Sequence, residues 1–145
     1  MIKLFKNLSI RENKALLNFP AYISLLAANN DGILDEAEKK SAIKLTHIKT
    51  FSCDPLLTEF YKETDKVFEV NIEKIDEALP KEKDARERII KRELLKLEKI
   101  VLKLGEEYTS TMHRSMKSFK EHVSKAHHNV LLDFIFPISI PGITD

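Results

Sequence analysis

Apolar residues recur every three or four positions along most of this chain, which is the spacing of one face of an α-helix. The first such run follows Ser9 and Glu12, which have the spacing of a capping box and so predict a helix start. Pro20 interrupts the run. Because proline lacks a backbone donor, we predict either a kink there or a second helix capped by Asn18.

The clearest turn signal in the chain is Asn29-Asn30-Asp31-Gly32. Asp35 and Glu38 follow it with the spacing of a second capping box, which predicts the start of another helix. Its apolar face continues to a predicted end near Thr50.

Asp54-Pro55 predicts a further helix start, because proline is favoured at the first helical position. The apolar stripe that follows either runs on to Pro80 or breaks near Asn71.

The longest helical pattern begins near Ala85 and keeps one apolar face as far as Val130. Gly105 lies in its middle. An uninterrupted helix of this length is unusual outside coiled coils, so we predict a break or bend at the glycine.

The fold class follows from these patterns. No segment shows the strict alternation of a strand, and the chain holds only three glycines and no tryptophan. We predict an all-α fold, a compact bundle of about five to seven helices in a single domain of residues 1–145. Residues 132–145 form an apolar tail punctuated by Pro137 and Pro141, which predicts irregular structure.

Composition limits the classes of function. The formal net charge is +1, so bulk charge gives no strong signal for nucleic acid. A single cysteine excludes a disulfide framework and a multi-cysteine metal site. The N-terminal MIKLFKNLSI lacks the apolar core of a signal peptide, and the longest apolar stretch, near residues 130–140, is too short to span a bilayer. We therefore predict a cytoplasmic protein with no transmembrane segment.

One segment carries candidate metal chemistry. From Ala27 the chain reads A-A-N-N-D-G-I-L-D-E-A-E, which places a glycine sixth, as in a cation-binding helix–loop–helix. The oxygen-bearing side chains at its third, fifth, ninth and twelfth places are Asn29, Asp31, Asp35 and Glu38. The first place, normally an aspartate, is Ala27. The segment is therefore either a Ca²⁺ or Mg²⁺ site short of one carboxylate, or a turn followed by a capping box.

The stretch LLAANNDGILDEAEKKSAI resembles the first repeat of the TerB-like (tellurite resistance) family, in which a small-residue helix end precedes Asp-Gly, an apolar residue and a glutamate. The segments DPLLTEFYKE and EALPKEKDARERIIKREL are similar to the middle segment of that family. The resemblance covers about residues 15–104.

The resemblance implies an all-helical fold of two pseudo-repeats, metal-binding acidic residues and a stress-associated role. It assigns Asp31 and Glu38 as metal ligands, with Asn29 and Asp35 as further oxygens. This chain departs from the family in the second repeat, where Gly105 is followed by two glutamates instead of an acidic Asp-Gly turn.

A basic flank supports an alternative function. His113, Lys117, Lys120 and His127 have helical spacing beside the apolar stripe. Such a flank is either a solvated face or a surface for phosphate groups, anionic lipid or an acidic partner. The apolar tail would either pack on the bundle or hold a protein partner or a second copy of the chain in a homo-oligomer. This alternative is an interaction module, with peripheral membrane contact among its roles.

Catalysis has little support in the sequence. The chain has no glycine-rich phosphate loop, no H-E-x-x-H and no G-x-S-x-G motif. Cys53 has only His47 near it in sequence as a base, and a small buried thiol is ordinary in such a setting. We therefore predict a protein that is not an enzyme.

Overall fold

The computed structural model describes residues 5–28 and 34–123. Within these two ranges it contains six α-helices, one short 3-10 helix and no strand. The predicted all-α bundle is therefore confirmed. The predicted irregular tail of residues 132–145 lies outside the described residues.

The first two helices are α1 (Ile10–Leu16) and α2 (Phe19–Ala28). The predicted capping box starts α1: the Glu12 amide donates to Ser9 Oγ at 3.0 Å, and the Ser9 amide donates to Glu12 Oε1 at 2.9 Å. Pro20 lies in the first turn of α2, so it belongs to a new helix and not to a kink. The Asn18 carbonyl accepts the first hydrogen bond of this helix, from the Tyr22 amide at 3.0 Å.

The next helix, α3 (Glu36–Ser52), starts at the second predicted capping box. The Glu38 amide donates to Asp35 Oδ1 at 2.7 Å, and the Asp35 amide donates to Glu38 Oε1 at 3.1 Å. The helix ends two residues beyond the predicted Thr50.

The Asp54-Pro55 signal opens a 3-10 turn, η2 (Pro55–Leu57), which leads into α4 (Thr58–Ala78). Asp54 Oδ1 accepts from the Leu56 amide at 3.0 Å and so caps the turn. Of the two alternatives for α4, the structure has the unbroken helix, which continues through Asn71.

The longest pattern is divided into α5 (Lys83–Leu102) and α6 (Glu106–Val123). Gly105 lies between them with φ +93°, a left-handed conformation that side chains rarely adopt. The predicted break at this glycine is confirmed.

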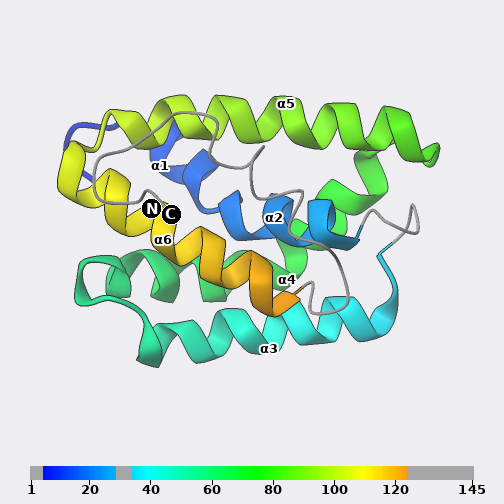
Figure 1. The fold of residues 1–145 in the computed structure, drawn as a ribbon, viewed down its shortest axis with the longest axis horizontal. Coiled ribbons are helices and arrows are strands. Elements are labelled where there is room, and N and C mark those ends of the chain that lie inside the picture. The colour runs from blue at the N-terminus through cyan, green and yellow to red at the C-terminus, as the bar shows by residue number, and fades with distance from the viewer. Residues whose placement is uncertain (1–4, 29–33, 124–145) are drawn as a thin grey trace.

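Helix α2 forms the centre of the bundle. Nine of its ten residues are buried, and the exception is the half-buried Tyr22. It packs against α3, α4, α5 and α6. Figure 1 shows α5 along one side of the bundle and α3 along the opposite side, with α2 between them. None of the helices in the described ranges combines the length and the apolar character needed to cross a membrane.

We expect Gly105→Ala to destabilise the protein by about 1–2 kcal/mol, the cost of a left-handed conformation for a residue with a Cβ. Apart from its two chain neighbours, no heavy atom of the described residues lies within 4 Å of a Cβ added at Gly105, so we expect the cost to come from the backbone conformation. Gly105→Asn should lose less, since asparagine tolerates this region. Urea denaturation followed by circular dichroism measures both changes, and equal stability of the alanine variant would contradict this account.

Candidate functional site: the outer face of helix α5

Helix α5 has two different faces. The buried face packs on the core, chiefly against α2. Its members are Arg86, Ile90, Leu94, Leu97, Glu98 and Val101. On the opposite side, five exposed residues follow one another at spacings of four, three, four and three, so they share one line along the helix. These are Arg88, Arg92, Leu95, Lys99 and Leu102, which we call the outer α5 face.

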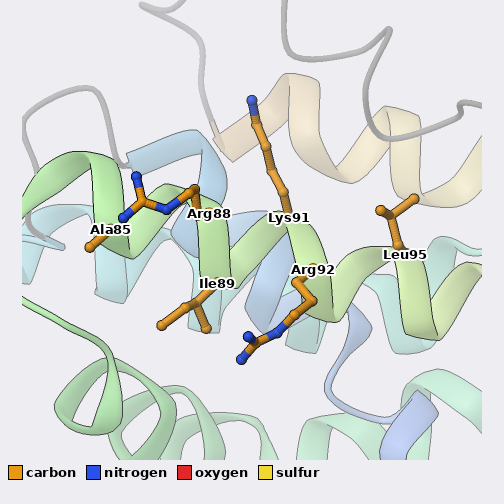
Figure 2. Close-up of a pocket in the computed structure, with 6 residues that line it drawn as sticks. All are labelled: Ala85, Arg88, Ile89, Lys91, Arg92 and Leu95. Atoms are coloured by element: carbon orange, nitrogen blue, oxygen red, sulfur yellow. The ribbon is translucent and has the colours of Figure 1, made fainter.

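A hollow follows the first half of this face. The described residues that line it are Ala85, Arg88, Ile89, Lys91, Arg92 and Leu95. Figure 2 shows Lys91 and Leu95 projecting to one side of the helix in that view, with Ile89 and Arg92 on the other. Three of the lining side chains are therefore cationic and three are apolar, a combination that suits an anionic group attached to an apolar body.

The helix carries a surplus of positive charge. It contains seven basic and four acidic residues, of which Arg86 and Glu98 are buried. Part of the remaining charge is paired along the helix: Lys91 Nζ lies 2.9 Å from Glu87, and Lys96 Nζ lies 3.0 Å from Glu93. Arg92 Nε also lies 3.8 Å from the Glu93 carboxylate. Because these pairs are in contact with solvent, they hold their partners weakly, and the surplus of cations gives the outer face a positive potential.

A buried arginine fixes the N-terminal half of α5. Arg86 is only 2% exposed and forms an ion pair with the carboxylate of Asp76 on α4. Its guanidinium also donates to the carbonyl oxygens of Asp76 and Pro80, at 3.4 and 3.5 Å. The arginine thus satisfies backbone acceptors at the C-terminal end of α4 and ties this end to the start of α5.

Polar contacts fix the C-terminal half as well. His113 Nε2 of α6 lies 2.7 Å from Glu98 Oε1, and both side chains are buried. Beyond the end of the helix, Asn7 Nδ2 donates to the Lys103 carbonyl at 2.9 Å, and Lys103 pairs with Glu12 of α1. The outer face is therefore carried by a helix that is anchored at both ends.

The predicted basic flank is not an exposed face of α6. His113 and Lys120 are buried, Lys117 is half-buried, and His127 lies outside the described residues. Burial also lowers the pKa of Lys120, because it disfavours the charged form. The physical reason for this correction is that α6 packs against α2, α3 and α5, so more of its circumference is covered than one apolar stripe requires.

The predicted metal ligands are only partly described. Asn29 and Asp31 lie outside the described residues, whereas Asp35 and Glu38 meet at the start of α3. Each of these two carboxylates accepts a backbone amide in the capping box. Within residues 5–28 and 34–123, no group of three or more histidine, cysteine, aspartate or glutamate side chains is arranged to hold a metal ion.

The outer α5 face was not predicted from the sequence, although its signal is present there. Arg88, Arg92 and Lys99 stand at helical spacing among residues that we assigned only to a core-facing helix. These basic residues form a second stripe, half a turn away from the apolar stripe of the same helix.

No protein family model, curated protein or solved structure matches this chain. The resemblance to the TerB-like family therefore stays a prediction.

We expect Asp76→Asn to destabilise the protein by about 3 kcal/mol, because it leaves the Arg86 guanidinium buried without a counter-charge. Arg86→Met in the same background should recover most of that loss, since an apolar side chain of similar length needs no partner. A double-mutant cycle by urea denaturation measures both effects. If the losses of stability in the two single variants simply add in the double variant, the two residues are not coupled.

Proposed function

We propose that this protein is a non-enzymatic binding module that associates with negatively charged partners through the outer α5 face. The observation that supports this proposal is the line of exposed cations and leucines on a helix whose other face is fixed in the core. The sequence predicted an interaction function for the basic flank of residues 113–127. We now assign that function to the outer α5 face instead.

Arginine suits such a role for chemical reasons. Its planar guanidinium can donate two parallel hydrogen bonds to a phosphate, sulfate or carboxylate group. Arg88 and Arg92 lie one helical turn apart, so both can reach the same anionic group or two neighbouring ones. Lys99, two turns further along, extends the positive line as a mobile point charge.

Binding through exposed cations has a recognisable dependence on salt. Such charges are screened within about 10 Å at 0.1 M salt, so the association should weaken steeply as salt rises. A chelator should leave it unchanged, because no metal takes part. This pair of responses separates the proposed function from cation binding.

We expect the protein to bind dextran sulfate, a soluble polyanion, at low salt. Replacing Arg88 and Arg92 by glutamine should weaken binding and make the logarithmic salt dependence shallower by roughly one for each charge removed. Isothermal titration calorimetry at several salt concentrations gives both quantities.

The matched control is Lys40→Gln with Lys44→Gln, which removes two exposed charges from α3 on the opposite side of the bundle (Figure 1). This variant should keep most of the affinity. An equal loss in both variants would mean that total charge, and not the outer α5 face, controls binding.

A second function, divalent-cation binding at the turn before α3, is favoured by one observation. Asp35 and Glu38 occupy the ninth and twelfth places of the loop pattern, and the structure brings them together at an exposed helix start. With Asp31 they would supply three carboxylates for Ca²⁺ or Mg²⁺. We propose this as the TerB-like, stress-associated function of the chain.

Titration of chelator-treated protein with Ca²⁺ or Mg²⁺ should then release or absorb heat and raise the melting temperature, as mass action requires. Asp31→Asn with Glu38→Gln should abolish both effects. Glutamine can close the same capping box, so the helix start is kept while the charge is lost. Glu36→Gln is the control, since Glu36 lies outside the ligand places of the pattern. Affinity retained in the double variant would refute the site.

A further inference from the structure

We propose that the partner of the outer α5 face is an anionic lipid bilayer, on which α5 lies flat with its axis in the plane of the membrane surface. This inference rests on the proposed function and names the anionic partner. It is carried by the leucines that share the line with the cations, together with the exposed position of α5 on one side of the bundle.

Leu95 and Leu102 are 41% and 38% exposed. They lie on the same line as Arg92 and Lys99, so any flat surface that meets the cations also meets the leucines. A soluble polyanion has no apolar region for these two side chains to contact. A bilayer offers phosphate groups to the cations and the acyl boundary to the leucines, which is how interfacial amphipathic helices bind.

The length of the face fits a surface better than a single small ligand. From Arg88 to Leu102 it extends along the helix for about 21 Å, the rise of fourteen residues. Figure 1 shows α5 running straight along one side of the bundle. The whole line can therefore touch one plane at once without any change in the fold.

The hollow at the N-terminal half of the face is suited to one lipid headgroup. Arg88 and Arg92 border it and can both donate to a phosphate, while Ile89 and Leu95 supply an apolar lining (Figure 2). The hollow thus places cations that can bind a headgroup phosphate beside apolar side chains that can contact the adjoining methylenes.

Helix α4 provides a natural comparison, because it also exposes an apolar residue. Val70 is 54% exposed, more than either leucine of the outer α5 face. Lys66 and Lys74 lie one turn to either side of Val70, but α4 as a whole carries seven acidic and only three basic residues, so an anionic surface would repel this helix. We therefore assign the membrane contact to α5 because of its cations together with its leucines, and not because of apolar exposure alone.

The chain contains no tryptophan, so a single introduced tryptophan reports on its own surroundings. We would prepare Leu95→Trp and Val70→Trp in the full chain and add vesicles of phosphatidylserine with phosphatidylcholine, or of phosphatidylcholine only. Leu95→Trp should show a blue-shifted emission with the anionic vesicles at low salt and none with the neutral ones. Val70→Trp should show no shift with either. The unsubstituted protein should sediment with the anionic vesicles.

Adding Arg88→Gln and Arg92→Gln to Leu95→Trp should lower the partition to anionic vesicles by about 30-fold, given the contribution expected for each cation near such a surface. Lys40→Gln with Lys44→Gln should change it far less. Leu102→Ser should weaken binding to vesicles and leave binding to dextran sulfate unchanged. Circular dichroism melts establish that each variant is folded.

The outcomes separate this inference from the proposed function. If the protein binds dextran sulfate through Arg88 and Arg92 but does not bind anionic vesicles, the bilayer inference is overturned and the proposed function stands. If it binds neither, both fail. Equal blue shifts for tryptophan at positions 70 and 95 would overturn the assignment to the outer α5 face.

Discussion

Helix α2 is apolar on all sides, and a helix of that kind must be covered on all sides. The other long helices cover it, since α3, α4, α5 and α6 all pack against α2. Each of them brings apolar side chains to the same core, including Phe68 and Ile72 from α4 and Met112 and Met116 from α6. The arrangement of the bundle follows from the need to enclose this one segment.

Enclosing α2 also brings polar groups out of water. Arg86, Glu98 and His113 are buried, and burial of such polar groups is costly unless they are paired and hydrogen-bonded. Arg86 meets Asp76 of α4, and Glu98 meets His113 of α6. These two contacts connect α5 to two different helices, so they favour one position of α5 along the bundle over neighbouring registers.

The candidate site is a consequence of where α5 lies. Because this helix has one face on the core and the other toward solvent, its exposed side chains share a straight line along the helix. Its fixed position matters for binding, since side chains on an anchored helix lose less freedom when they meet a surface than side chains on a loop. Helix α6 differs because it contacts helices on several sides, and His113, Lys117 and Lys120 on it are buried or half-buried.

Local sequence determined where the helices start and stop. Ser9 with Glu12, Asp35 with Glu38, the Asp54-Pro55 pair and Gly105 all act through their own backbone neighbours, so they could be read without any tertiary contact. The joint position of Asp35 and Glu38 at one helix start was predictable for the same reason. Tertiary packing decided which polar positions stay exposed. His113 and Arg92 both flank apolar stripes in the sequence, yet the structure buries the first and exposes the second. Helical spacing fixes the angle between two side chains of one helix, but only the number and placement of its neighbours decide how much of its circumference meets water.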